Sequence, residues 1–359
     1  EFSGEWDNTS IGDCCSDLEY GMNAASKNFD GVNKYIRITD IDEQTAEYKQ
    51  DSLVSPDALL EDKYLVKDGD ILFARTGAST GKTYMYAPQD GKLYYAGFLI
   101  RANVNFGTNP KFVFYQTQTH RYKKWVSIMS MRSGQPGINS QEYASYQFWK
   151  PTKEEQDKIS DLMTLLDQRI QTQKKIIEDL KKLKDAICIS QLKSHYETED
   201  MIGDLCKPIA AKQYISADIT AAGAYPIIQQ GENPIAGYTE SMPFMDYKDV
   251  ILFGDHTLSI YRPKAPFLLS TDGIKILKPN DMVNRDYLYY LIYTFMPEPE
   301  GYKRYYSILK DIWVPVPNIS TQKSIVGKLL SIDSKIEIEA RMLELQFQQK
   351  QYLLASMFI

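Results

Sequence analysis

The chain of 359 residues repeats itself, and this repetition limits its architecture more than any other feature. Three landmarks that combine apolar residues with Gly, Asp or Pro occur twice in the same order: Ile11–Cys15 and Ile202–Cys206, Lys67–Phe73 and Tyr247–Phe253, Phe148–Pro151 and Ile312–Pro315. The offset between the copies shrinks from 191 through 180 to 164, so the second copy has lost residues between shared landmarks. Unequal loops on a common frame produce this pattern, which predicts two similar domains.

Each copy ends in a long helical pattern. Apolar residues recur in steps of three and four: Ile159, Met163, Leu166, Ile170, Ile177 and Leu180 in the first copy, and Ile325, Leu329, Ile332, Ile336, Leu343, Phe347 and Leu354 in the second. This is the 3.5-residue period of a coiled-coil seam. No Pro or Gly interrupts residues 152–193, and about 40 residues at 1.5 Å each predict a rod of roughly 60 Å. Two such helices pair most simply with each other, antiparallel; the alternative is that each packs on its own domain.

The segments before the helices have a different pattern. Short β-branched and aromatic runs punctuated by Gly, Pro, Asn and Asp predict strands over 34–39, 70–74, 94–103, 250–254 and 273–277. Apolar spacing predicts short helices over 111–125 and 285–295. We therefore predict α+β domains over residues 1–150 and 199–319, a central spacer helix over 151–198 and a distal spacer helix over 320–359.

The net charge of −6 hides a strong asymmetry along the chain. Residues 1–91 carry 8 basic and 18 acidic side chains, whereas residues 92–150 carry 8 basic and 1 acidic. Within the basic stretch, Arg121–Trp125 interleaves cations with aromatics, and Tyr302–Tyr306 repeats a weaker version in the second copy. Phosphate binding needs cations on one surface, and base reading needs Arg, Gln or Asn on loops or helices. The duplication favours nucleic-acid binding over a merely solvated basic face.

A phosphate-binding loop is a competing interpretation of Gly77–Thr83, which follows a predicted strand. The Walker A motif has four residues between its glycines, and this segment has three between Gly77 and Gly81. The second copy has no Lys at the equivalent place. A Gly-rich hairpin that displays Arg75, Lys82 and Thr83 is therefore favoured over a nucleotide hydrolase.

Other chemistries find little support. The four cysteines are too few and too irregular for a disulfide framework and predict buried, reduced thiols in a cytoplasmic protein. The three histidines have no Cys or carboxylate at metal-ligand spacing. No apolar run approaches the roughly 18 residues of a membrane span, and the first residues lack the order of a signal peptide. We expect no active site, no cofactor and no metal.

The landmarks, taken together, resemble one family over nearly the whole chain: the specificity subunits of type I restriction-modification systems. The segments that carry the resemblance are Phe2–Trp6 with Ile11–Asp13, Gly69–Gly77, Ser133–Gln135, Trp149–Pro151, Glu154–Gln156, Tyr225–Gly231 and Ile251–Thr257. Their order and duplication are specific, although no single motif is. Two departures are a short Trp-Lys-Pro entry to the central helix and Thr321–Gln322 in place of Glu-Gln before the distal one.

The resemblance implies two target-recognition domains, each reading one half of a split double-stranded DNA sequence, held apart by an antiparallel coiled coil. A rod of roughly 60 Å spans somewhat under two turns of B-DNA, at about 34 Å per turn, and would fix the gap between the half-sites. The resemblance also implies partners: two methyltransferase subunits and, for cleavage, ATP-driven restriction subunits. The chain itself would then be non-catalytic and would select the adenines that its partners methylate.

The expected DNA contacts are cations, amides, hydroxyls and one imidazole on exposed-looking loops and helices. They are Arg75, Thr76, Lys82, Thr83, Arg121, Lys123, Lys124, Arg132, Ser133, Gln135, Asn139, Gln229, Gln230, His256, Thr257, Arg262, Lys264, Lys303 and Arg304. The alternative function is a coiled-coil scaffold with two protein-binding globular ends.

Overall fold

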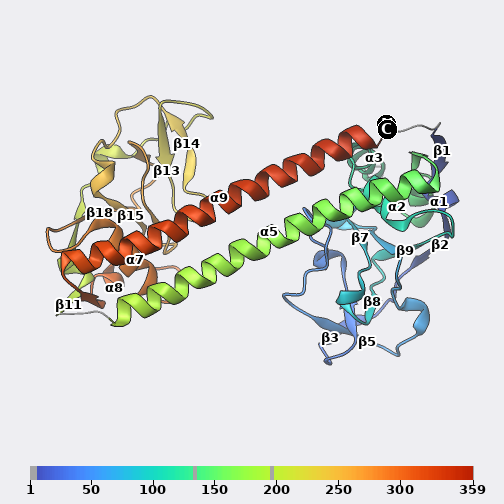
Figure 1. Ribbon diagram of the computed structural model, residues 1–359, viewed down its shortest axis with the longest axis horizontal. Helices are drawn as coiled ribbons and strands as arrows, with labels where there is room; N and C mark the ends of the chain where they lie inside the picture. The colour runs from blue at the N-terminus through green and yellow to red at the C-terminus, as the bar shows by residue number, and fades with distance from the viewer. Residues whose placement is uncertain (1–5, 132–135, 195–197, 359) are drawn as a thin grey trace. The chain divides into compact units, whose positions relative to one another are not determined.

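The computed structural model describes residues 6–131, 136–194 and 198–358. The chain divides into two compact units, one formed by residues 1–173 and 342–359 and the other by residues 174–341. Two long helices, α5 (Lys153–Ser194) and α9 (Ile319–Met357), contribute to both units (Figure 1). Each helix begins within two residues of its expected start at 151 or 320, directly after a Pro-containing segment.

The first unit is built on a four-stranded antiparallel sheet in the order β2 (Cys15–Tyr20), β9 (Leu99–Val104), β6 (Asp70–Ala74), β7 (Thr83–Met85). Smaller pairs are β1 (Asp7–Ser10) with β10 (Gln147–Lys150), β3 (Ala25–Asn28) with β5 (Val54–Asp57), and β4 (Lys34–Ile36) with β8 (Leu93–Tyr95). The helices are α1 (Ile11–Cys14), α2 (Pro110–Gln116), α3 (His120–Ser130) and α4 (Ser140–Ala144). Short 3-10 turns are η1 (Ile38–Asp40), η2 (Asp62–Tyr64), η3 (Gly77–Ser79) and η4 (Pro88–Asp90).

The second unit repeats this frame, and three of the strands in its four-stranded sheet are shorter than their counterparts. Its four-stranded sheet has the order β12 (Cys206–Ile209), β18 (Ile274–Pro279), β15 (Ile251–Gly254), β16 (Ile260–Tyr261). Beside it lie β11 (Thr198–Met201) paired with β19 (Trp313–Val316), and a sheet of β14 (Ile235–Thr239), β13 (Tyr225–Ile228) and β17 (Leu268–Leu269). The helices and turns are α6 (Ile202–Leu205), α7 (Arg285–Thr294), α8 (Tyr306–Leu309), η5 (Lys212–Tyr214) and η6 (Tyr247–Asp249).

Three sequence expectations need correction in detail. The strand expected over 34–39 ends at Ile36, and Ile38–Asp40 form the turn η1. The single helix expected over 111–125 is two helices, because Thr117 ends α2 and the Thr119 side chain caps α3 by accepting the Tyr122 N–H at 3.2 Å. The single strand expected over 94–103 is interrupted by a turn, where the Leu99 N–H donates to the Ala96 carbonyl at 2.8 Å. The breaks between α2 and α3 and between β8 and β9 depend on local hydrogen bonds, which the spacing of apolar residues does not predict.

Burial on both faces explains why the central strands have continuous apolar runs. In β6, Ile71 and Phe73 enter one hydrophobic core while Leu72 and Ala74 enter another on the opposite face of the sheet. Successive side chains of a strand point to opposite faces, so a strand buried on both faces needs apolar residues at every position. The corresponding strand β15 is divided between two cores in the same way.

The two long helices pair antiparallel, as the heptad pattern predicts. In the first unit Ile159 and Met163, near the start of α5, share a core with Leu354 of α9. In the second unit Leu192, near the end of α5, shares a core with Leu329 of α9. The start of each helix therefore contacts the end of the other, and their seam continues into the domain cores.

One buried glutamine attaches each long helix to its domain. Gln156 is 2% exposed; its Oε1 accepts the Asn109 N–H at 3.0 Å, and its Nε2 donates to the Pro151 carbonyl at 2.8 Å. Gln322 repeats this arrangement, accepting the Asn284 N–H at 2.7 Å. In both copies the glutamine joins the helix to the domain. The residue before it, Glu155 or Thr321, can therefore differ between the copies.

The four cysteines are free and buried, as expected. Burial raises the pKa of the Cys15 and Cys206 thiols to about 12, which keeps them protonated and unreactive at neutral pH. Among the described residues, no helix has the length and apolar character needed to cross a membrane.

Candidate nucleic-acid interface

Each domain fixes a loop to the end of its central strand. After β6, the Arg75 N–H donates to the Phe98 carbonyl at 3.0 Å, and the Arg75 carbonyl accepts the Ile138 N–H at 2.9 Å. After β15, Asp255 makes the same two bonds, to the Gly273 carbonyl at 2.8 Å and from the Tyr305 N–H at 2.8 Å. We call these places the first and second strand-end sites. They are defined by Arg75–Thr76 with residues 136–138, and by Asp255–His256 with residues 303–305.

At the first strand-end site, the Arg75 guanidinium contacts two aromatic rings. Its guanidinium carbon lies 4.9 Å from the Tyr20 ring centroid and 5.9 Å from that of Phe98, and its Nε donates to the Gly97 carbonyl at 3.2 Å. Tyr20 and Phe98 are 43% and 56% exposed. The contacts orient the guanidinium without a carboxylate partner within the described residues. Beside it, Thr76 forms a bridge with Gly137.

The glycine-rich segment between β6 and β7 is a hairpin, as predicted, but it does not display all of its polar residues. Thr83 is 3% exposed and its hydroxyl lies 2.7 Å from that of Thr117, so its expected role in DNA contact gives way to a buried hydrogen bond. Lys82 forms an ion pair with Glu43, with 3.4 Å between Nζ and Oε2. Gly81 has φ +89° and its missing Cβ would lie 2.4 Å from Val126 Cγ1, so close packing on α3 accounts for this glycine.

Helix α3 presents the densest basic segment of the first domain. Lys123 and Lys124 are exposed, as is Arg121, whereas Tyr122 is buried and Trp125 packs against it with ring centroids 6.0 Å apart. The aromatic residues of the interleaved segment therefore anchor the helix, and its cations face solvent. The expected contacts Arg132, Ser133 and Gln135 lie outside the described residues. Asn139 caps α4 by accepting the Glu142 N–H at 2.9 Å.

At the second strand-end site, contacts on its ring and on its backbone hold His256 in place. Its ring stacks on that of Tyr302 at 4.7 Å with an interplanar angle of 4°. Its Nδ1 lies 3.1 Å from the Lys303 carbonyl oxygen, and its backbone N–H donates to Gln230 Oε1 at 3.0 Å. His256, after the end of β15, is thereby joined to the loop that contains Lys303 and to the side chain of Gln230.

The neighbouring expected contacts are held less tightly. Gln229 Nε2 donates to the Asn233 carbonyl at 2.9 Å, and the exposed Thr257 hydroxyl lies 2.9 Å from that of Ser259. Lys303 Nζ pairs with the exposed Glu300 at 2.7 Å. Arg304 reaches Asp272 only at 4.0 Å, with both side chains more than half exposed. Exposed pairs of this kind exchange readily for another anion such as phosphate.

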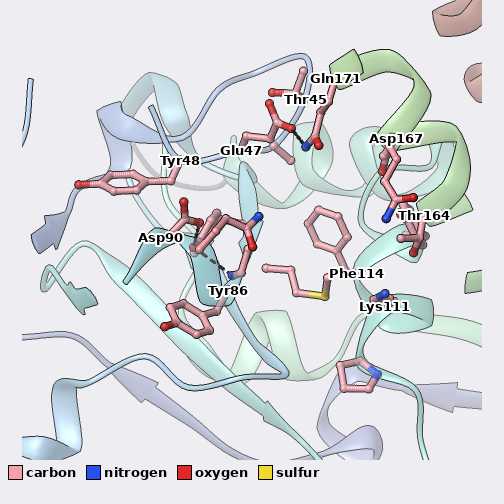
Figure 2. Close-up of a pocket in the computed structure, with 18 of the residues that line it drawn as sticks. Thr45, Glu47, Tyr48, Tyr86, Asp90, Lys111, Phe114, Thr164, Asp167 and Gln171 are labelled. Carbon is pink, nitrogen blue, oxygen red and sulfur yellow. Dashed lines mark hydrogen bonds between the residues drawn. The ribbon is translucent and has the colours of Figure 1, made fainter. Parts of the chain in front are cut away.

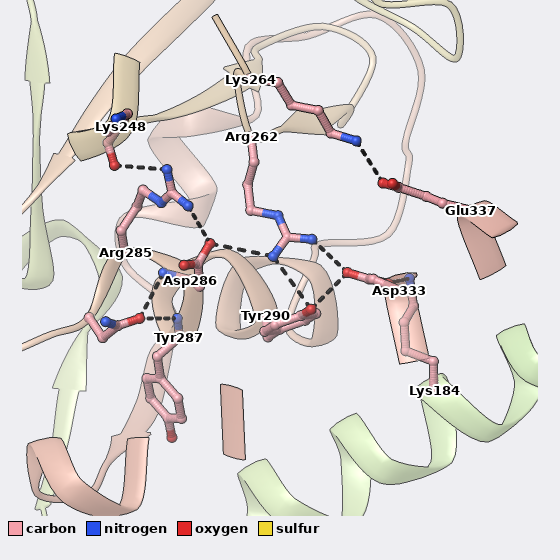
Figure 3. A network of polar contacts seen from close by, with 11 residues as sticks. Lys184, Lys248, Arg262, Lys264, Arg285, Asp286, Tyr287, Tyr290, Asp333 and Glu337 are labelled. Carbon is pink, nitrogen blue, oxygen red and sulfur yellow. Dashed lines mark hydrogen bonds and ion pairs between the residues drawn. The ribbon is translucent and has the colours of Figure 1, made fainter. Parts of the chain in front are cut away.

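Arg262 and Lys264 lie against helix α9 in the second unit (Figure 3). Arg262 pairs with Asp333 at 2.5 Å and with Asp286 at 3.4 Å, and is 18% exposed. Lys264 pairs with Glu337 at 2.7 Å on the surface. Arg262 therefore joins its domain to the helix, a structural role that the sequence did not predict.

A large pocket in the first unit is lined by helices α2, α5 and α9 and by loops around residues 45–48 and 84–90 (Figure 2). Its volume is about 840 Å³. Its most buried carboxylates already have partners: Asp90 accepts from the Tyr84 hydroxyl at 2.6 Å, and Asp167 accepts from Tyr115 at 2.9 Å and pairs with Lys350 at 2.5 Å. The contacts of Asp167 connect the domain to α5 and α9, whereas the bond between Tyr84 and Asp90 lies within the domain. Within the described residues, no group of three His, Cys, Asp or Glu side chains is placed to hold a metal ion.

Comparison with known proteins decides the family. The model of the type I restriction modification DNA specificity domain matches residues 4–182 and again residues 198–345. The chain belongs to this family. Each of the two specificity domains contains one strand-end site, and the chain is a DNA-recognition subunit of a type I restriction-modification system.

Solved structures agree on the fold of these specificity domains and their helices. The S subunit of a type I restriction-modification system from M. genitalium is similar over 100% of this chain and 97% of that chain, with a TM-score of 0.65 and 16% identity. A chain from a structure on complex assembly and conformational transition of the type I R-M system is similar over 99% and 97%, with a TM-score of 0.57 and 16% identity. No curated protein sequence matches the chain.

Three aromatic residues at the strand-end sites of the specificity domains were not among the expected contacts: Tyr20, Phe98 and Tyr302. Tyr302 belongs to the aromatic–basic segment that the sequence singled out, so its place beside a cation was a usable signal. Tyr20 and Phe98 are far from Arg75 in sequence and meet it only through the sheet. Their exposure is the unusual feature, because large exposed rings beside a cation are typical of binding surfaces.

Proposed function

We propose that the chain is the non-catalytic subunit that reads a bipartite DNA target, one half-site for each domain, and directs partner adenine methyltransferase and restriction subunits to it in the cytoplasm. Residues 1–150 and 199–319 would read the half-sites. The helices over 151–198 and 320–359 would fix the gap between them. The observation that carries the proposal is the duplicated strand-end site, which offers an oriented Arg75 in one domain and an oriented His256 in the other.

Surrounding cations support this assignment. In the first domain, Lys123 and Lys124 of α3 are exposed and suited to phosphate contact. In the second, Lys303 and Arg304 follow Tyr302, on which the imidazole stacks, and they pair only with the exposed carboxylates of Glu300 and Asp272, which a phosphate can replace. Phosphate contacts position a protein on DNA, and the oriented side chains between them discriminate bases.

The paired helices offer a surface for the methyltransferase subunits. In the first unit, Leu162, Leu165, Met342 and Leu345 are 44%, 59%, 43% and 57% exposed. Leu162, Leu165 and Met342 line a groove of about 580 Å³ along α5 and α9. Such a row of exposed apolar residues on a helix pair supports docking of further helices. Two docked subunits, one for each domain, are what the internal repeat favours.

The test is the genome-wide adenine methylation pattern in a host that expresses the chain with its cognate methyltransferase, compared with the same host without the chain. A new bipartite motif with a fixed gap is expected. If the chain binds its methyltransferase and no new motif appears, DNA targeting is refuted and the scaffold function takes its place.

Charge reversal separates DNA recognition from a protein-binding scaffold. Replacing Lys123, Lys124 and Arg132 by Glu should abolish DNA binding in a recognition subunit and leave a scaffold unaffected. The reversed residues in α3 are exposed, so the fold should tolerate them. Lys82→Ala tests the phosphate-loop interpretation directly, because only a nucleotide hydrolase would lose ATP turnover.

A further inference from the structure

The Lys303 carbonyl fixes the role of one nitrogen in the imidazole of His256. A backbone carbonyl oxygen can only accept, so Nδ1, which lies 3.1 Å from the Lys303 carbonyl, must carry the proton. In the neutral ring, Nε2 is then an acceptor with no proton of its own. Nε2 has no hydrogen-bond partner in the described part of the chain, and it is not among the buried unpaired polar atoms, so it is open to solvent.

The surroundings of His256 hold this orientation. The ring lies flat on Tyr302, which is itself 87% exposed, so stacking covers a face of the ring and leaves the Nε2 edge free. Gln230 accepts the His256 N–H and packs over Gly273, where a Cβ would lie 2.3 Å from Gln230 Nε2. The loop that supplies the Lys303 carbonyl is itself fixed, because Asp255 Oδ1 accepts the Tyr306 N–H at 2.8 Å.

We propose that His256 reads one base of the second half-site by accepting a hydrogen bond from an exocyclic amino group, and so selects adenine or cytosine over guanine or thymine on the strand that it faces. In the major groove, adenine N6 and cytosine N4 are donors, whereas guanine O6 and thymine O4 are acceptors. A neutral Nε2 pairs with the first two and repels the others. It also repels phosphate, which offers only acceptors, so a neutral His256 contacts bases rather than the DNA backbone. This inference rests on the proposed DNA-reading function and adds the chemical class of the base.

Two substitutions test the inference in the methylation assay with the complete complex. His256→Phe keeps a flat ring on Tyr302 and removes the acceptor, so one position of the second half-site should lose its discrimination between amino and keto bases. His256→Arg places donors at the same point, so the preference at that position should reverse toward guanine or thymine. The expected change in selectivity is on the order of ten- to a hundredfold. The first half-site and the gap serve as internal controls and should not change.

A second test uses the wild-type complex with altered DNA, so its result does not depend on whether the variants fold. Once the motif is known, DNA probes that carry a hydrogen in place of the amino group at that position should bind on the order of ten- to a hundredfold more weakly. The inference is overturned if this probe binds like the natural target, if both variants keep the wild-type motif, or if methylation falls uniformly with the motif unchanged. Absence of any bipartite motif with the wild-type chain would instead refute the proposed function.

Discussion

Two ion pairs connect the same segment of the second domain to the same helix, and they should differ sharply in their contribution to stability. Arg262 pairs with Asp333, and Lys264, two residues later, pairs with Glu337, one turn later on α9 (Figure 3). The Arg262 and Asp333 side chains are 18% and 17% exposed, whereas those of Lys264 and Glu337 are 71% and 63% exposed. The two pairs therefore differ in burial, and their carboxylates also differ in the number of partners that they hold.

Removing the carboxylate at the buried position leaves three groups without their acceptor. Asp333 also accepts the Tyr290 hydroxyl at 2.7 Å and pairs with Lys184 of α5 at 3.3 Å. Deleting one member of a buried pair costs about 3–5 kcal/mol; because Asp333 retains some exposure, we expect Asp333→Ala to lower the free energy of unfolding of the second unit by about 2–4 kcal/mol. Glu337→Ala should cost less than about 1 kcal/mol.

The pH dependence of this contribution has a definite sign. Burial alone would raise the pKa of Asp333, but the Tyr290 hydrogen bond and the charges of Lys184 and Arg262 outweigh it and hold the pKa below its usual value. A carboxyl whose pKa is lower in the folded state stabilises the fold above its unfolded pKa, near 3.9, and loses that contribution as the pH falls through the folded value. The difference between wild type and Asp333→Asn should therefore be constant near neutrality and shrink below about pH 4.

The assay is urea unfolding followed by circular dichroism, with hydrogen exchange of α7 amides to assign the transition to the second unit. A double-mutant cycle with Arg262→Ala gives the coupling between the two charges. The reasoning is refuted if Glu337→Ala and Asp333→Ala cost the same, or if the coupling is below about 0.5 kcal/mol.

Other predictions concern the helix attachments, the first strand-end site and the spacer. Gln156→Ala should destabilise the first unit by about 1–3 kcal/mol, because it leaves the Asn109 N–H without its acceptor; thermal unfolding measures this, and the exposed Gln171→Ala provides the comparison. Arg75→Gln should alter one position of the first half-site and leave the second intact in the methylation assay; a change in both would contradict a local role. Inserting four residues near 171–175 adds about 6 Å of helix and should lengthen the gap by about two base pairs, with both half-site sequences retained. An altered half-site would contradict the spacer function.

Much of the fold was predictable because its signals are local or periodic. The continuous apolar run of β6 predicts a strand buried on both faces, and the alternating steps of Ile159, Met163 and Leu166 predict a helix seam. Strand and helix ends were less predictable, as the break between α2 and α3 shows, because capping by one threonine decides them. Polar residue type and a loop-like sequence predict the candidate DNA contacts, but neither feature distinguishes a side chain that faces solvent from one with an internal partner.

The sequence by itself determined the two domains, their common frame and the apolar seam of each long helix, because repetition and heptad spacing are properties of the chain order. The shared cores of the structure then confirmed the expected antiparallel pairing of these helices. Tertiary structure alone decided which polar residues are available. Thr83 is buried against Thr117, and Arg262 is held by Asp333. His256 remains available, with its acceptor defined by a carbonyl from a distant loop. Each outcome depends on partners more than 30 residues away along the chain, and such partners are fixed by packing rather than by local sequence.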